Sequence, residues 1–158
     1  MSNQENVFET ILAPMTGTAV AITEVPDPIF IEKILGDGVA IVPTEGKVVS
    51  PVDGTVSKVA ETGHIYAVTS DNGVEVVIHV GLETVALNGK CFQIHVKEGD
   101  KVKAGDLLAD VDLEFIKETG RNSITPIVIG SSLEGKELVC EEGEVQAGKT
   151  VIIEIKQK

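Results

Sequence analysis

The stretch that decides the fold is residues 62–81, TGHIYAVTSDNGVEVVIHVG. Two runs of alternating side chains flank Asp71-Asn72-Gly73, and Asn-Gly between two such runs is the strongest short-range signal for a β-hairpin. Glu75, Val77 and His79 share one face of the second strand, because successive side chains point to opposite faces. The other face of that strand carries four apolar residues: Val74, Val76, Ile78 and Val80.

The length of the hairpin loop sets which residues face each other. With Asn72-Gly73 as a two-residue loop, Tyr66 lies opposite His79, and His64 lies one diagonal step away on the same face. With the loop one residue earlier, the two histidines are directly opposite. A loop with an odd number of residues would separate them, but it would also place Ile65 opposite a polar-face residue, which the apolar pattern disfavours. We therefore expect two of the three histidines to meet on one face.

The composition favours β structure. The chain has 158 residues, of which 42% are hydrophobic and 24% are charged, as in an ordinary globular protein. Because it has only four Phe, one Tyr and no Trp, valine and isoleucine must fill much of the core, and both favour strands. Many short apolar runs separated by turn residues predict an all-β fold, an antiparallel β-sandwich or barrel. We expect one domain, 1–158, with a loose start at 1–6.

Two short helices and one interrupted strand are expected within this β pattern. Asp27-Pro28 supplies a cap and a first helical position, and apolar residues at helical spacing follow until Gly36. Residues 112–119 form the second helical turn, between an aspartate cap and a terminating glycine. Residues 124–129 form a strand that contains Pro126, so we expect either an edge strand or a proline at the strand start.

Charge and terminal sequence restrict the class of partner. Thirteen Lys and Arg against 25 Asp and Glu give a net charge of −12. The chain has no basic stripe that could neutralise the phosphates of a nucleic acid, and an anionic membrane surface would repel it. Cys91 and Cys140 have no metal-like spacing, and we expect both to be reduced bystanders. The N-terminus lacks the features of a signal peptide, and no apolar run approaches the ~18 residues of a membrane span. We expect a cytoplasmic protein without membrane insertion.

A pair of facing histidines allows three kinds of role. One imidazole can act as a nucleophile while the other donates a hydrogen bond to the transferred group, both can bind a metal, or both can be structural. A zinc site would lack a third ligand unless Glu75 or Glu83 supplied it, and the HExxH motif is absent. GxSxG and phosphate-loop motifs are also absent. His95 has no visible partner, and we assign it a structural role. These residues do not identify which of His64 and His79 is the nucleophile.

Several separated motifs resemble the glucose-type IIA component of the bacterial sugar phosphotransferase system, from Ile11 to Ile155. The resemblance implies an antiparallel β-sandwich in the cytosol, monomeric, that carries a phosphoryl group on a histidine. Such a protein receives the group from the phosphocarrier HPr and passes it to a cysteine of the IIB domain of a sugar permease. The stretches that carry the resemblance are VPDPIFIEKILGDGVAI (25–41), SPVDGTVSKV (50–59), ETGH (61–64) and VEVVIHVGLETV (74–85).

The resemblance also implies residue roles. His79 matches the histidine that the family phosphorylates on Nε2, His64 matches the histidine that hydrogen-bonds the phosphoryl group, and Thr62 matches the hydroxyl residue that orients it. Gly63 stands where some members carry Asn, and Glu83 where some carry Asp. We expect no cofactor and no metal. The implied partner-binding residues are Phe30, Ile34, Val77, Glu83 and Val85.

Two alternative classes share parts of the pattern. Residues 13–18, 50–59 and 96–108 resemble the turn-rich rhythm of biotinyl and lipoyl carrier domains. Those carriers attach their cofactor to a lysine at a hairpin tip, whereas the candidate tip here is Asp71-Asn72-Gly73 and contains no lysine. A zinc-binding sandwich protein is the other alternative, and it depends on a third ligand for the histidine pair.

Overall fold

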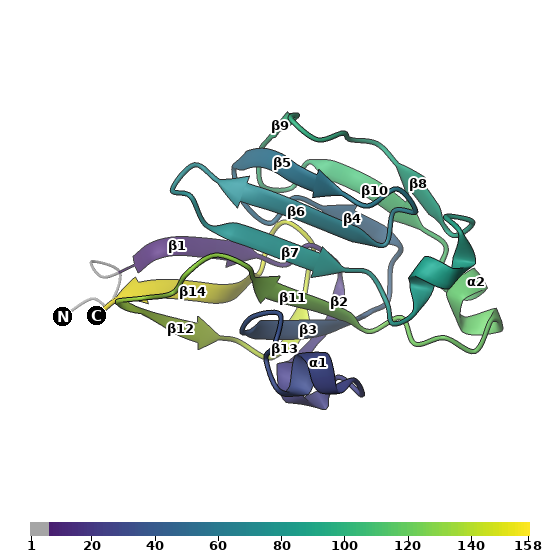
Figure 1. Ribbon diagram of the computed structural model, residues 1–158, viewed down its shortest axis with the longest axis horizontal. Coiled ribbons are helices and arrows are strands. Elements are labelled where there is room, and N and C mark those ends of the chain that lie inside the picture. Colours follow the sequence, from purple (N-terminus) through teal and green to yellow (C-terminus); the bar gives the residue numbers. More distant parts are fainter. Residues whose placement is uncertain (1–6) are drawn as a thin grey trace.

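The computed structural model describes residues 7–158, so the predicted loose start at 1–6 lies outside the described part. These residues form antiparallel β-sheets with two short α-helices, and the all-β prediction is confirmed (Figure 1). The helices are α1 (Pro28–Ile31) and α2 (Leu113–Glu118), with 3-10 turns η2 (Ile22–Glu24) and η3 (Thr84–Leu87). The strands are β1 (Val7–Leu12), β2 (Gly17–Ala21), β3 (Gly38–Pro43), β4 (Lys47–Val49), β5 (Gly54–Val59), β6 (Ile65–Ser70), β7 (Glu75–His79), β8 (Phe92–Ile94), β9 (Lys101–Val102), β10 (Leu107–Val111), β11 (Thr125–Ile129), β12 (Lys136–Cys140), β13 (Gly143–Val145) and β14 (Val151–Gln157).

Three sheets enclose the main core. The largest has the strand order β13-β2-β3-β11-β7-β6-β5-β9, and the smaller ones have the orders β1-β14-β12 and β4-β10-β8. In Figure 1, β5, β6 and β7 run side by side in the upper half, and β1, β14 and β12 lie at the lower left. As the composition predicts, the core is rich in isoleucine and valine; its fully buried members include Ile11, Ile41, Val48, Val68, Val76, Ile78, Leu108, Ile127, Ile152, Ile153 and Ile155.

The hairpin of β6 and β7 forms, but in the register that we disfavoured. The loop has three residues, and Ser70 pairs with Val74, its N–H donating to the Val74 carbonyl at 2.8 Å. Gly73 closes the loop with φ of 88°, a left-handed conformation that glycine adopts without a steric penalty. Every pair is therefore shifted by one residue, and Ile65 lies opposite His79. The predicted pairing of the tyrosine with this histidine is wrong.

The shift also exchanges the two faces of β6. Tyr66 and Val68 are completely buried and lie in the core beside Val76 and Ile78, whereas Ile65 lies on the outer, histidine face. A buried aromatic ring removes about 150–250 Å² from water. Burying the face of β6 that carries the tyrosine ring therefore removes more apolar area from water than burying the face that carries isoleucine, alanine and threonine.

The prediction for Pro126 is partly right. Pro126 is the second residue of β11, so the expected strand start is confirmed, but β11 lies between β3 and β7 and is not at an edge. Pairing with β7 begins at Ile127, which lies opposite Ile78. Because that pairing starts after the proline, the missing N–H leaves this part of the ladder intact.

Both predicted helix caps are confirmed. The Asp27 carboxylate accepts from the Ile29 N–H at 3.1 Å, and the Asp112 carboxylate accepts from the Phe115 N–H at 3.1 Å. Within α1 only Phe30 is buried. The other apolar residues around α1 are exposed: Ile29, Ile31, Ile34 and Leu35.

The Tyr66 hydroxyl is buried and has no hydrogen-bond partner within residues 7–158. Tyr66→Phe should therefore leave the free energy of unfolding unchanged or raise it by about 1–3 kcal/mol, since the desolvation cost of the hydroxyl disappears. Urea denaturation of both proteins measures the difference. Tyr66→Leu is the control and should lose stability by leaving a cavity. A loss of 1 kcal/mol or more in the phenylalanine variant would indicate a hidden partner such as a buried water.

Candidate functional site

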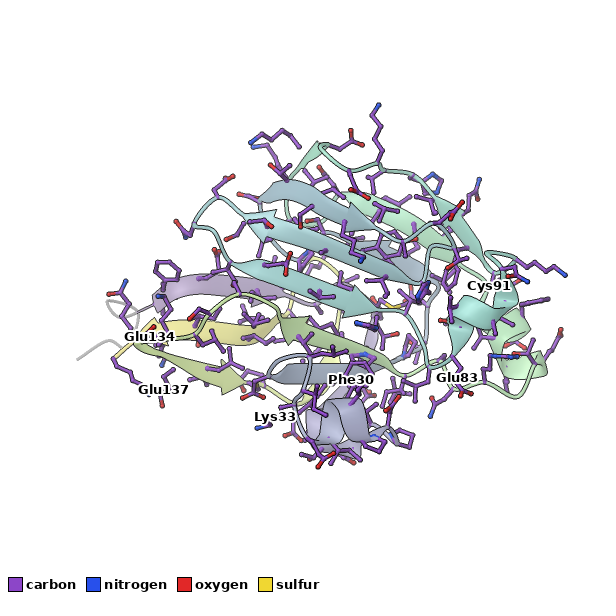
Figure 2. The ribbon with its side chains drawn as sticks, in the orientation of Figure 1. Phe30, Lys33, Glu83, Cys91, Glu134 and Glu137 are labelled. Atoms are coloured by element: carbon purple, nitrogen blue, oxygen red, sulfur yellow. The ribbon has the colours of Figure 1, made fainter. Side chains whose placement is uncertain are left out.

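A small cavity of about 170 Å³ lies where α1, the end of β7 and the following loop meet. Two histidines line it, and most of the other lining residues are apolar. Figure 2 labels two residues of its wall, Phe30 in α1 and Glu83 on the loop that follows β7. The lining residues are Asp27, Ile29, Phe30, Leu35, His64, His79, Gly81, Leu82, Glu83, Thr84 and Val85.

The first histidine, His79, is the last residue of β7. Its neighbours Ile78 and Val80 are completely buried, so the backbone on both sides of it is anchored in the core. Its imidazole is half-buried on the outer face and meets the ring of Phe30 edge-on, with ring centroids 5.2 Å apart and planes at 76°. The core and Phe30 together hold this ring in one place.

The second histidine, His64, reaches the cavity by a route that strand alternation does not predict. It pairs with Val80, whose N–H donates to the His64 carbonyl at 2.8 Å, and regular alternation would therefore point its side chain to the core face. However, His64 precedes the first residue of β6 and follows Gly63, which has φ of 79°. Both imidazoles line the same cavity, so the predicted convergence is confirmed although the predicted register is wrong.

Thr62 contacts the second histidine. Its Oγ1 lies 2.6 Å from Nδ1 of His64. A methyl group at Gly63 would lie 2.8 Å from Cβ of Phe92, so the turn fits closely against β8. The hydrogen bond occupies Nδ1 of His64 and leaves its Nε2 for another partner.

Burial in this cavity keeps the imidazoles uncharged at neutral pH. Burial is the main cause that lowers the pKa of His79 to about 4. The charge that His64 carries when protonated and the charge of Lys58 act in the same direction, and the Asp27 carboxylate opposes them. Burial and then the charge of Lys58 also lower the pKa of His64. A neutral imidazole has one nitrogen lone pair free to attack or to bind.

The expected partner-binding residues are not all at the surface. Ile34 and Val85 are 66% and 50% exposed, and Glu83 lines the cavity rim. Phe30, in contrast, is only 4% exposed and forms the wall against the histidine. Val77 is half-buried and packs against a second apolar cluster. That cluster consists of Ile22, Val25, Phe30, Ala40, Ile124 and Val128.

The structure adds charged residues that the sequence pattern did not mark as part of the site. Asp27, expected only as a helix cap, also lines the cavity. Lys58 influences both imidazoles although it lies on a different strand, β5. Hydrophobic periodicity carries no signal for either contact, because both depend on tertiary packing.

The third histidine lies elsewhere and has a partner. Nε2 of His95 lies 2.7 Å from a carboxylate oxygen of Asp110, and Nζ of Lys47 lies 3.2 Å from the other oxygen. Hydrogen bonds from His95 and then Lys47 lower the pKa of the Asp110 carboxyl group. The sequence does not reveal this partner, because β8 and β10 become neighbours only in the folded sheet. The contact agrees with the structural role that we expected for His95.

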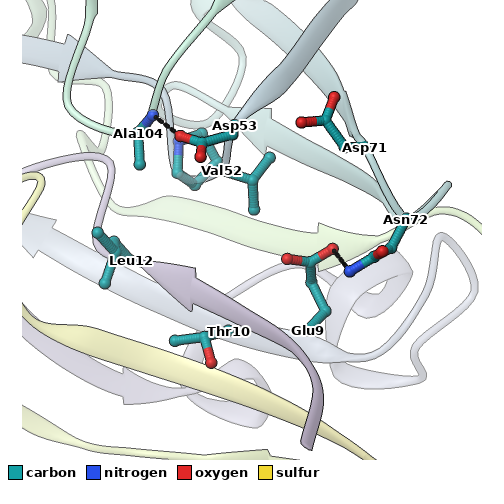
Figure 3. A pocket seen from close by; sticks show the side chains of 9 residues that line it. Glu9, Thr10, Leu12, Val52, Asp53, Asp71, Asn72 and Ala104 are labelled. Atoms are coloured by element: carbon teal, nitrogen blue, oxygen red, sulfur yellow. Dashed lines mark hydrogen bonds between the residues drawn. The ribbon is translucent and has the colours of Figure 1, made fainter.

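A second cavity, of about 320 Å³, lies between the N-terminal strand and the hairpin tip (Figure 3). Its carboxylates support the loops: Glu9 accepts from the Asn72 amide at 3.3 Å, and Asp53 accepts from the Ala104 N–H at 2.8 Å. Neither histidine nor cysteine is among its lining residues.

In residues 7–158 no group of three or more His, Cys, Asp or Glu is placed to hold a metal ion. No helix of the described chain is long and apolar enough to cross a membrane.

Comparison with known proteins identifies relatives over nearly the whole chain. The PTS system glucose-specific EIIA component of Bacillus cereus is 47% identical over 151 residues, covering 95% of this chain and 92% of that protein. The PTS system glucose-specific EIICBA component of Staphylococcus carnosus is 48% identical over 144 residues, covering 90% of this chain and 21% of that protein.

The fold has a solved counterpart as well. The structure of glucose permease IIA from Mycoplasma capricolum superposes with a TM-score of 0.86 at 36% sequence identity, covering 92% of this chain and 94% of that one. Residues 9–134 match the family described as phosphoenolpyruvate-dependent sugar phosphotransferase system, EIIA 1. The resemblance found in the sequence is thereby confirmed, and the chain belongs to the EIIA 1 family of the phosphoenolpyruvate-dependent sugar phosphotransferase system.

Proposed function

We propose that this chain carries a phosphoryl group on Nε2 of His79, which it accepts from the phosphocarrier HPr and passes to a cysteine of a IIB domain. The observation that carries the proposal is that two neutral imidazoles share one small cavity with a partly exposed apolar rim. The names of the relatives support a glucose permease as acceptor, and the EIICBA relative supports a IIB partner. The chain acts as one cytoplasmic IIA domain and as a monomer.

Each transfer is an in-line displacement at phosphorus. The lone pair of His79 Nε2 attacks the phosphorus of the phosphohistidine of HPr; the new N–P bond forms as the old N–P bond breaks, and the donor imidazole leaves with the electron pair. A IIB cysteine thiolate then attacks in turn, so that an S–P bond forms, the N–P bond breaks and neutral His79 is regenerated. The protein contributes positioning and charge stabilisation.

His64 stabilises the transferred group in this scheme. When the Thr62 hydroxyl donates to Nδ1 of His64, the imidazole proton resides on Nε2. That N–H can donate to a phosphoryl oxygen, and hydrogen bonds to charged groups are the stronger kind. Thr62 thus selects the tautomer that His64 needs.

Incubation with phosphoenolpyruvate, enzyme I and HPr should add a single phosphoryl group, detected by intact mass, that is lost in acid and kept in base. His79→Ala should abolish the gain because the attacking nitrogen is missing. His64→Gln should still accept the group but pass it on poorly. His95→Gln, which changes the histidine outside the cavity, is the matched control and should behave like the unaltered protein. No mass gain in the presence of active HPr would refute the proposal, and acceptance by His79→Ala would reverse the two roles.

The imidazole of His79 should titrate near pH 4 in an NMR experiment, in contrast to about 6.5 in the unfolded chain. Because its pKa is lower in the folded protein, the unfolded chain binds the extra proton first. This group should therefore stabilise the fold less as pH falls from about 6.5 towards 4, and His79→Gln should show a flatter dependence of stability on pH. A midpoint near 6.5 in the folded protein would contradict the burial that we describe.

Val85→Asp should weaken transfer from HPr by at least ~10-fold, about 1.4 kcal/mol. The new carboxylate would be desolvated without a partner when the proteins dock. The thermal midpoint of the Val85→Asp variant should change little, because Val85 is 50% exposed.

Val77→Asp should lower stability as well as transfer, since Val77 packs against the second apolar cluster. Val42→Asp, at a valine 44% exposed away from the cavity, is the control for added charge. Equal transfer by the Val85 and Val42 variants would remove Val85 from the docking surface.

A further inference from the structure

Strand β5 contains a β-bulge close to the histidine pair. Val56 pairs with Val68 of β6, but the next pair is Lys58 with Ala67, so Ser57 is the extra residue. Thr69, on the outer face of β6, donates to the hydroxyl of Ser57 at 3.0 Å. Ser57 and Lys58 therefore both lie on the outer face.

The bulge decides the position of Lys58. In an unbroken antiparallel ladder, residue 58 would lie opposite Tyr66, whose side chain is completely buried in the core. With the extra residue, Lys58 lies opposite Ala67, and Ala67 lies opposite Val77 of β7. His79 is two residues further along β7 and shares this face. Bulges commonly redirect a side chain next to an active site.

The side chain of Lys58 is exposed, and its ammonium group makes no ion pair with any residue in 7–158. Ala67 is only 1% exposed although it faces outward, so side chains on this face cover it. Its cross-strand neighbours there are Lys58 and Val77. Lysine commonly lays its apolar stem along such a surface and keeps its ammonium group in water.

The cavity needs a positive charge once it is phosphorylated. A phosphoryl group brings a charge of about −1.5 to −2. Two carboxylates, Asp27 and Glu83, already line the cavity, in a chain with a net charge of −12. Among the cationic side chains, Lys58 is the one whose charge lowers the pKa of both histidines. It therefore acts on the site before any partner docks.

We propose that Lys58 is the phosphoryl-binding cation of this site: its ammonium group pairs with the oxygens of the phosphoryl group on His79, and the bulge at Ser57 exists to present it there. This role rests on the proposed function of His79. It differs from partner recognition, because it stabilises the free phosphorylated protein and not the complex. The distinction can be measured, since docking contacts change transfer rates but not the equilibrium between the free proteins.

The experiment is the phosphoryl-transfer equilibrium with HPr at concentrations too low for stable complexes. Phospho-HPr is mixed with the full chain, and intact mass gives the phosphorylated fraction of both proteins once it is constant. Lys58→Gln should shift the equilibrium constant about five-fold towards phospho-HPr, at the upper end for a solvent-exposed ion pair. Lys58→Arg, which keeps the charge, should recover most of this loss.

Lys101→Gln is the matched control. Lys101 is an exposed lysine on β9, the strand next to β5, and its replacement changes the net charge by the same amount. Unlike Lys58, it is not among the charges that shift the pKa of either cavity histidine. It should leave the equilibrium constant unchanged. If Lys58→Gln slows the transfer but leaves the equilibrium constant at the value of the unaltered protein, Lys58 is a partner contact and the proposal is overturned. An equal change of the equilibrium constant in Lys101→Gln would overturn it as well.

A second measurement separates this proposal from the proposed function. An NMR titration of the unphosphorylated protein should show a higher pKa for both cavity imidazoles in Lys58→Gln, because a nearby positive charge is removed. Lys101→Gln should show no such rise. If the unaltered protein accepts no phosphoryl group, the proposed function fails and the Lys58 role is rejected with it. If it accepts the group while Lys58→Gln changes neither the titration nor the equilibrium, only the Lys58 role is rejected.

Discussion

The register between β6 and β7 is the constraint on which the site depends. A three-residue loop pairs Ser70 with Val74, and every later pair follows from that choice. A slip of one residue would turn the completely buried Tyr66 out of the core, since side chains alternate between faces. With this register the outer face of β6 offers His79 no polar partner from within the strand. The second imidazole must therefore come from the loop before β6, where Gly63 allows the backbone to turn.

The sequence predicted the class of fold, the faces of β7 and both helix caps, because these depend on local periodicity and capping chemistry. It mispredicted the faces of β6, where both sets of residues are partly apolar and only the area of the tyrosine ring distinguishes them. The pairing of His95 with Asp110 depends on which strands become neighbours, which no local pattern specifies. The role that we assign to Lys58 depends on one extra residue in a ladder. The histidine pair converges nevertheless, because His64 lies before the first residue of β6, next to Gly63, and its side chain does not follow the alternation of the strand.

The function that we propose places two conflicting electrostatic requirements on the cavity. Before transfer it must keep the imidazole neutral, and burial against Phe30 with a nearby positive charge does so. After transfer it must hold a multiply charged anion, which a dry apolar pocket alone would disfavour. A lysine at the solvent-exposed edge is suited to both states. Its charge disfavours protonation of the histidines before transfer and attracts the phosphoryl oxygens afterwards, while its ammonium group stays hydrated.

The exposed apolar rim around α1 and the ring of His79 are both held by Phe30. A helix of four residues such as α1 is far too short to be stable alone. Its position comes from the Asp27 cap and from the buried ring of Phe30, which meets the His79 ring at 5.2 Å. The exposed isoleucines around α1 are thus presented by the same side chain that confines the imidazole. Whatever moves Phe30 must displace the rim and the His79 ring together, so that, under the function we propose, a partner that presses on the rim acts directly on the geometry of transfer.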